Sequence, residues 1–391
     1  MSIQESRSMW RMKESVCRLS GHHPPQPLPS RERLRFAPGF SLVEVLITIA
    51  ILGIVLTAIT NTFVDMLKGF KQQGKIAETS IEGIIGLEIL RRDIESAGYG
   101  LPWTLPAGAS FSERADAYRD DSPLQPPRAI LCGNADTATN STISGADYLV
   151  IKAVNVARNV QCQRWAYLTS AGTTTWNPSS EDLGNTDMAI VISPGTPEKT
   201  PRSLVVNNGT FAALKSNLTA SGFASSDETR IVYGIRDSGG VNRPFHRADY
   251  YVKVENANMP SRCAPGTGIL YKNVHNLATD GLGGGLPLID CVADMQVITR
   301  HTTTNGDEFV NGLEGTFAAD AQTIRNQLTE VRVYILAHEG QKDSSFTYPS
   351  STIRVGQSAS LGRDLDLTGI TDWQNYRWKV YTLVVKPRNL R

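Results

Sequence analysis

The sequence lacks an excess of charge of either sign, with 39 Lys and Arg side chains against 38 Asp and Glu side chains in 391 residues. A chain with this balance presents no overall field that would attract nucleic acid or an acidic partner, so we expect no nucleic-acid binding. The sequence also lacks the spacings of common catalytic sites, among them His-Glu-x-x-His, Gly-x-Ser-x-Gly and the phosphate-binding loop. We therefore expect no enzymatic activity and no cofactor.

Spacings typical of metal sites are missing as well. The histidines of the C-terminal half are widely scattered, and each is expected to lie at the surface or to be half-buried. These residues are His246, His275, His301 and His338. No Cys-x-x-Cys pair accompanies them, which disfavours a zinc site. We expect no metal site.

Two acidic stretches and three tryptophans leave room for a surface ligand. Residues 116–121 and 305–308 carry oxygen ligands of the kind that calcium prefers, but neither stretch has the spacing of an EF-hand loop. Trp165, Trp176 and Trp373 are candidates for an exposed adhesive patch or for the core. We expect them to pack in the core.

The sequence does contain one long apolar run, from Gly39 to Val64. Glu44 is its single charged residue among the 25 residues from Phe40 to Val64. A helix over this run would cross a hydrocarbon core of about 30 Å at roughly 1.5 Å per residue. An ionised Glu in such a span costs a few kcal/mol unless a partner neutralises it, which favours a functional role for Glu44.

Positive charge precedes the apolar run. Residues 1–39 hold seven Lys or Arg against three Glu. By the positive-inside rule this end stays in the cytoplasm and the rest of the chain is sent outward. A cleaved secretory signal is disfavoured because its apolar core would be shorter, roughly 7–15 residues, with a small-residue cleavage site after it.

The junction Ala37-Pro38-Gly39-Phe40-Ser41-Leu42-Val43-Glu44, with Arg31, Arg33 and Arg35 before it, resembles the prepilin leader signature of type IV pilins and type II secretion pseudopilins. In that family a membrane peptidase cuts after the glycine, and the new N-terminal residue is methylated. The resemblance implies that Gly39 precedes the cut, that Phe40 becomes the N-terminus, and that Glu44 is the acidic residue that makes a contact in assembly. The alternative is an ordinary signal anchor with a chance Glu.

Beyond the span, the helical pattern is expected to continue as an amphipathic helix over residues 65–98. The expected apolar stripe recurs every three or four residues and consists of Phe63, Met66, Phe70, Ala77, Ile81, Ile84, Ile89, Leu90 and Ile94. Glycines in this half lower helix propensity and favour a local bend. Gly98 is expected to end the helix near Ser96, and Pro102 prevents a long continuation.

Four of the five cysteines, Cys132, Cys162, Cys263 and Cys291, follow the span, and Cys17 precedes it. An even number in an exported domain suggests two disulfides in an oxidising compartment. Three pairings are possible from sequence. We favour Cys132 with Cys162 and Cys263 with Cys291, because each pair closes a loop of about thirty residues, worth about 3 kcal/mol in the chain-entropy account.

Residues 103–391 are expected to form an exported β-rich domain, because short apolar or alternating runs recur between turn-forming clusters. The expected strands are Tyr148–Val154, Met188–Ser193, Ser203–Val206, Arg230–Ile235, Tyr250–Val254, Gly268–Tyr271, Met295–Ile298, Val331–Leu336 and Tyr376–Val385. In the last strand, Tyr376, Trp378, Val380 and Val384 are expected to share the packed face. The fold class is therefore α+β, a long N-terminal helix on an antiparallel domain, with residues 1–39 as the leader and residues 40–64 as the span.

The segments 90–99, 288–297, 331–336 and 384–390 resemble the corresponding segments of PilW-type minor pilins. This resemblance implies a subunit that primes type IV pilus assembly near the tip. Its partners would be the prepilin peptidase, other minor pilins, the major pilin and a tip adhesin. It would stand in the inner membrane, N-terminus in the cytoplasm, before it enters the pilus at the cell surface. The alternatives are a J-type pseudopilin of type II secretion and a membrane-anchored periplasmic enzyme or receptor.

Overall fold

The computed structural model describes residues 39–134, 143–195, 201–255, 259–313 and 315–390. The basic and proline-rich leader predicted over residues 1–38, including Cys17, lies outside these described residues. The chain divides into two units, one ending at Phe63 and one beginning at Val64. Helix α1 (Leu42–Ser96) begins in the first unit and ends in the second.

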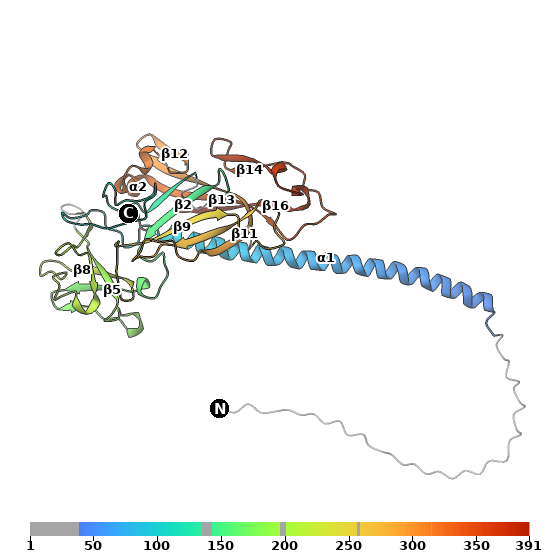
Figure 1. Ribbon diagram of the computed structural model, residues 1–391, viewed down its shortest axis with the longest axis horizontal. Helices are drawn as coiled ribbons and strands as arrows, with labels where there is room; N and C mark the ends of the chain where they lie inside the picture. Colours follow the sequence, from blue (N-terminus) through green and yellow to red (C-terminus); the bar gives the residue numbers. More distant parts are fainter. Residues whose placement is uncertain (1–38, 135–142, 196–200, 256–258, 314, 391) are drawn as a thin grey trace, which may run out of the picture. The chain divides into compact units, whose positions relative to one another are not determined.

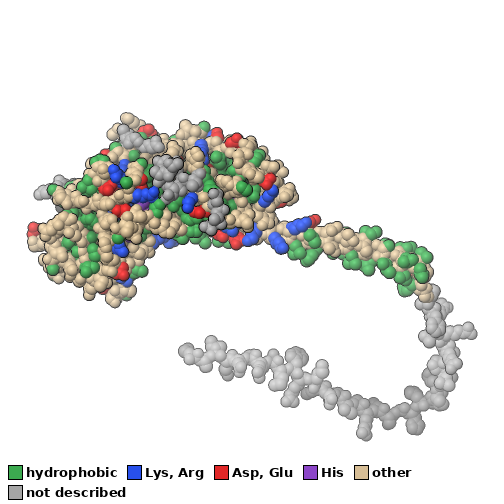
Figure 2. Space-filling view, viewed as in Figure 1, with side chains coloured by type: hydrophobic (Ala, Val, Ile, Leu, Met, Phe, Trp, Pro, Cys, Tyr) green, Lys and Arg blue, Asp and Glu red, His purple; other side chains and the backbone are tan. Residues whose placement is uncertain are grey.

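In the first unit every described side chain, from Gly39 to Phe63, is exposed. Figure 2 shows hydrophobic side chains along the free part of α1, with backbone and other side chains between them. Among the described residues, α1 is the one helix long and apolar enough to cross a membrane. Its threonine hydroxyls donate to backbone carbonyls of the preceding turn, for example Thr57 to Gly53 and Thr60 to Leu56, both at 2.8 Å. The span therefore satisfies its own hydroxyl groups, as an apolar surrounding requires.

In the second unit, the C-terminal part of α1 packs on the β-structure through a different face from the one expected. The buried residues of α1 are Gly83, Gly86, Leu90, Asp93 and Ile94. Most of the expected stripe is exposed instead, including Met66, Phe70, Ile81 and Ile84 at 56–61% of their full area. Of that stripe, only Leu90 and Ile94 are fully buried. The helix is continuous through its glycines, and it ends at Ser96, before Gly98 at φ +85°, as predicted.

The larger sheet is antiparallel throughout and has eight strands (Figure 1). Along the sheet they are β1 (Ile130–Asn134), β2 (Asp147–Ala153), β9 (His246–Lys253), β10 (Gly268–Val274), β11 (Leu286–Thr303), β13 (Leu328–Glu339) and β16 (Arg377–Val385), with β12 (Gly306–Asn311) paired to β11. Strand β11 is irregular where Cys291 takes φ +59°, and its register to β13 shifts between Val292 and Asp294. Strands of this sheet carry Cys132, Cys291, His246, His301 and His338, which are discussed below.

A smaller, six-stranded antiparallel sheet and a separate hairpin complete the β-structure (Figure 1). The smaller sheet runs β4 (Gly172–Thr173), β3 (Trp165–Thr169), β8 (Arg230–Arg236), β5 (Met188–Ser193) and β6 (Ser203–Leu204), with β7 (Ala212–Leu214) paired to β5; the hairpin is β14 (Thr352–Gly356) with β15 (Gly362–Asp366). The short helices are η2 (Gln161–Gln163), η3 (Ser179–Glu181), η4 (Lys215–Asn217), η5 (Gly315–Ala318), α2 (Ala321–Gln327), η6 (Leu367–Gly369) and η7 (Trp373–Asn375).

Strand β16 shows that both faces of the larger sheet are covered. Tyr381 and Leu383 join the main core together with Leu90 of α1. Tyr376 and Trp378 join a second core beneath the β14–β15 hairpin. The prediction that Tyr376, Trp378 and Val380 share a packed face is confirmed, but Val384 is exposed at 44%. The opposite face, which carries Tyr381 and Leu383, is packed as well because α1 covers it.

Candidate assembly site and other predicted site residues

The start of α1 is built by the residues of the predicted processing junction. Gly39, Phe40 and Ser41 are exposed and precede the helix, so this stretch is open to a peptidase. The Oγ atom of Ser41 accepts a hydrogen bond from the Glu44 amide at 3.2 Å, and its carbonyl accepts one from the Val45 amide at 3.2 Å. Ser41 with Glu44 three residues later is the capping-box pattern, which sets where the helix begins.

Glu44 lies in the first turn of α1, and its side chain is exposed. It is the only charged residue from Gly39 to Val64. Within the described residues no cation forms an ion pair with it, whereas Asp65 farther along the helix pairs with Lys68 at 3.3 Å. The partial positive charge at a helix N-terminus favours a carboxylate in this turn. An apolar surface with one unpaired carboxylate at its end is suited to receive a cation from another molecule.

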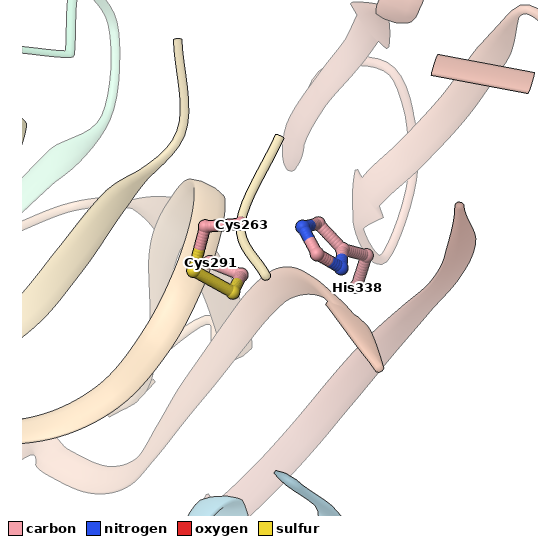
Figure 3. A group of neighbouring side chains, drawn as sticks. All are labelled: Cys263, Cys291 and His338. Carbon is pink, nitrogen blue, oxygen red and sulfur yellow. A yellow bond between two sulfur atoms is a disulfide. The ribbon is translucent and has the colours of Figure 1, made fainter. Parts of the chain in front are cut away.

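Cys263 and Cys291 form a disulfide, the pair that the sequence analysis favoured, and His338 of β13 lies beside it (Figure 3). The Nε2 atom of His338 accepts a hydrogen bond from the Ala264 amide at 2.9 Å. Burial, with a smaller contribution from Arg262, lowers the pKa of His338 to about 3. The potential ligand atoms of Cys263, Cys291 and His338 lie within 4.8 Å of one another. Metals bind thiolates, so the group is not a metal site while the disulfide is intact.

The predicted disulfide between Cys132 and Cys162 is not formed in the structure, where both residues are buried thiols. Cys132 lies on β1 of the larger sheet, whereas Cys162 lies in η2, next to β8 of the smaller sheet. The Sγ atom of Cys162 is 3.2 Å from the carbonyl oxygen of Asn159. Burial raises the pKa of the Cys162 thiol to about 11. A short separation in sequence therefore does not bring these two side chains together.

The expectation of surface or half-buried histidines is wrong. His246, His275, His301 and His338 are all at most 4% exposed. Burial lowers the pKa of His246 to about 4. The Nε2 atom of His275 lies 2.7 Å from a carboxylate oxygen of Asp249, which also accepts from Tyr148 at 2.6 Å. These histidines lie on or next to strands of the larger sheet, and they are buried because both faces of that sheet are covered.

Carboxylates of the acidic stretch at residues 116–121 form ion pairs with Arg and Lys side chains of the same chain. The Asp116 carboxylate accepts from Arg247 at 2.7 Å, and a carboxylate oxygen of Asp120 lies 2.6 Å from the ammonium of Lys152. In the stretch at residues 305–308, Asp307 pairs with Arg300 at the β11–β12 turn. These carboxylates thus serve internal ion pairs, which accounts for them without calcium.

Of the three tryptophans, Trp373 is half-buried against the second core. Trp165 and Trp176 are also half-buried, but they line a cavity of about 570 Å³. The expectation that all three pack in the core is therefore only partly met.

The sequence analysis predicts neither the interior ion pairs nor the helix cap at Ser41. The Ser-x-x-Glu pattern that begins at Ser41 is a sequence signal from which the cap could have been predicted.

Residues 36–60 match the model of the prokaryotic N-terminal methylation motif. No curated protein matches the chain, and no solved structure matches it. The chain thus carries a prepilin signal, followed by one long apolar helix and an antiparallel β-rich domain. This combination indicates a type IV pilin-like or pseudopilin-like protein. The motif implies processing by prepilin peptidase, anchoring in the inner membrane and assembly with other pilins.

Proposed function

We propose that the protein is a minor pilin that helps to prime type IV pilus assembly and sits near the pilus tip. The observation that carries this proposal is the exposed apolar surface of α1, with the carboxylate of Glu44 at its start, which pairs with no cation among the described residues. In the membrane, lipid covers this surface. In a filament, the helices of neighbouring subunits cover it, and the β-rich domain faces outward.

The exposed side of α1 beyond the span supports the same proposal. Leu67, Phe70, Ile81, Ile84 and Ile85 are each 44–61% exposed, whereas the opposite side of the helix packs on the sheet. An apolar side chain contributes roughly 1.5–3 kcal/mol when it moves from water to a packed interior. This row therefore extends the surface on which neighbouring helices can pack. A domain of residues 64–391 is bulky for a subunit repeated at every step, which favours a position at the tip.

The first experiment tests the processing step. We expect N-terminal sequencing of the mature protein to begin with methylated Phe40, because Gly39 and Phe40 are exposed ahead of the helix. An uncut chain, or a cut at another bond, would contradict the proposal and favour the membrane-anchored enzyme or receptor.

The second experiment tests the role of Glu44. In a filament, Glu44 would pair with the N-terminal amine of a neighbouring subunit, so that neither charge is buried alone. We expect Glu44→Ala to leave cleavage and membrane insertion unchanged and to lower the amount in sheared pili by roughly tenfold or more, since breaking a buried pair costs a few kcal/mol. Asp65→Ala is the matched control, because it removes an exposed carboxylate from the same helix.

Recovery of the Glu44→Ala protein in pili at the wild-type level would contradict this role. Immunogold labelling of sheared pili separates the pilus from a type II secretion pseudopilus, the rival assembly of the J-type pseudopilin. Label on pili supports the minor pilin. Label absent from pili, together with genes of a secretion system beside this one, would favour the pseudopilin.

A further inference from the structure

A cavity of about 570 Å³ opens at one edge of the smaller sheet. Trp165 at the start of β3 and Trp176, which follows β4, supply its aromatic side chains. Arg158 and Arg164 supply two guanidinium groups, and Glu181 supplies one carboxylate. This volume lies within the range of ligand pockets in proteins, roughly 300–1,000 Å³. Neither the prepilin signal nor the assembly surface of α1 requires such a cavity.

The two tryptophans form a fixed apolar wall. Their ring centroids lie 4.8 Å apart with the planes inclined by 54°, and Tyr167 meets Trp165 edge-on at 5.2 Å. The Nε1 atom of Trp176 donates a hydrogen bond to the carbonyl oxygen of Trp165 at 2.7 Å. Both rings are half-buried, so each keeps part of its surface accessible. The negative face of an indole attracts the weakly positive C–H groups of a pyranose ring.

The two arginines differ in how they are engaged. The guanidinium of Arg158 is held by the buried carboxylate of Asp93, with N–O distances of 2.5 and 3.0 Å. Arg164 forms a looser ion pair with the Asp187 carboxylate, and the distance of 3.7 Å is too long for a hydrogen bond. In the part of the chain that the structure describes, the Arg164 guanidinium makes no hydrogen bond, and its side chain is 25% exposed. Its donors are therefore available to a carboxylate or sulfate, which a guanidinium binds with two parallel hydrogen bonds.

We propose that this cavity binds a short carbohydrate that bears an acidic group. The apolar face of a sugar ring lies on Trp165 and Trp176, and the acidic group binds Arg164. Among the described residues that line the cavity, Glu181 is the only one with a carboxylate, whereas hydrolysis of a glycosidic bond generally uses two carboxylates on opposite sides of that bond. The site therefore binds its sugar without cleaving it. The proposal holds whether the protein acts in a pilus or in a pseudopilus.

The experiment titrates the full chain in detergent micelles with three sugars and follows tryptophan fluorescence. The probes are 3′-sialyllactose, which carries a carboxylate, 3′-sulfolactose, which carries a sulfate, and uncharged lactose. We expect at least one acidic sugar to bind about tenfold or more tightly than lactose, because lactose has no acidic group that could form an ion pair with Arg164. The comparison of the two acidic sugars identifies the acidic group.

Two variants and one control locate the binding. Arg164→Gln should abolish the preference for the acidic sugar, and Trp176→Ala should weaken the binding of all three probes. Arg354→Gln is the control, because it removes an exposed guanidinium from the distant β14–β15 hairpin, where it pairs with Asp364 at 2.6 Å. Wild-type affinity is expected for this control. If Trp176→Ala fails to fold, Arg164→Gln still decides the proposal, since among the described residues the Arg164 side chain makes no hydrogen bond and only the ion pair with Asp187 at 3.7 Å.

Three results would overturn the proposal. The first is no saturable binding of either acidic sugar up to about 10 mM, a concentration that still detects weak sites. The second is equal affinity for lactose and the acidic sugars. The third is an equal loss of binding in Arg164→Gln and Arg354→Gln, which would show a general charge effect and not this cavity.

Discussion

The ammonium of Lys272 lies 2.5 Å from the Oδ2 atom of Asp93, and both side chains are buried. Asp93 belongs to α1 and Lys272 to β10, so this ion pair joins the helix to the larger sheet. Arg158 and the hydroxyl of Tyr250 also donate to the Asp93 carboxylate. Burial lowers the pKa of Lys272, and the neighbouring Asp93 carboxylate opposes that shift. A single carboxylate therefore anchors the helix at three points.

We expect Asp93→Asn to destabilise the second unit by about 3–5 kcal/mol, because the substitution leaves Lys272 and Arg158 opposite a neutral amide. Urea denaturation of the full chain in detergent measures the free energy of unfolding. Glu88→Gln is the matched control: it removes an exposed carboxylate from the same helix, where it pairs with Arg92 at 2.8 Å and contributes at most about 0.5 kcal/mol. Equal losses in the two variants would contradict the anchoring role of Asp93.

Two glycines of α1 should respond in opposite directions to alanine. A Cβ atom at Gly86 would lie 2.4 Å from the carbonyl oxygen of Leu288, whereas one at Gly74 would meet nothing within 4 Å. We expect Gly86→Ala to lower the free energy of unfolding by about 1–3 kcal/mol, because the helix must move away from β11. Gly74→Ala should raise it by about 0.5–1 kcal/mol through helix propensity. Thermal unfolding followed by circular dichroism compares the two, and shifts of the same sign would contradict the close approach at Gly86.

The same contact explains why the packed face of α1 could not be predicted from hydrophobic periodicity. The helix approaches the sheet where it has no side chains, at Gly83 and Gly86, so large residues such as Ile81 and Ile84 lie on the outside. A pattern of apolar residues identifies a surface that is buried somewhere, in lipid, in a neighbour or in the domain. It does not identify which of these covers the surface.

Local signals predicted several elements well. Strand β5 has the predicted bounds, Met188–Ser193, because an apolar run of that length lies between turn-forming residues. Strand β11 was predicted only over Met295–Ile298, although it extends over Leu286–Thr303. The other residues of β11 could not be predicted as strand, because the strand is irregular at Cys291 and contains buried polar residues. One of these is Asp294, whose partner Arg363 lies on the distant β15. Long-range pairing of this kind leaves no periodic trace in the sequence.

The buried histidines should make the fold sensitive to acid. Because the pKa of His338 is about 3 in the folded protein and about 6.5 in an unfolded chain, only the unfolded state takes up this proton between those pH values. Stability is therefore expected to fall as pH decreases from 6.5, by up to about 1.4 kcal/mol per pH unit for one such group. His246, with its pKa lowered to about 4, adds to the slope.

We expect His338→Gln to reduce the number of protons taken up on unfolding by about one, because glutamine does not titrate. Its amide oxygen can still accept a hydrogen bond from the Ala264 amide. The measurement is the free energy of unfolding from urea denaturation at several values between pH 7 and pH 4.5. Parallel curves for the wild type and the variant over that range would show that His338 does not bind its proton on unfolding.

The last prediction concerns the thiols and separates one disulfide from two. In the structure Cys263 is bonded to Cys291, whereas Cys132 and Cys162 are buried thiols. In a Cys17→Ser variant of the full chain, maleimide should modify no cysteine under native conditions, because Cys132 and Cys162 are at most 2% exposed. In denaturant without reductant it should modify two, and a mass increase of two labels measures this.

Reduction in denaturant before labelling should raise the count to four, and the double variant Cys263→Ser with Cys291→Ser should again give two. The expectation of two disulfides makes a different prediction, since no cysteine would then react in denaturant without reductant. That result would mean that Cys132 and Cys162 pair in the exported protein. Since the first lies on β1 and the second beside the smaller sheet, such a bond would require one of these elements to lie elsewhere than in this fold.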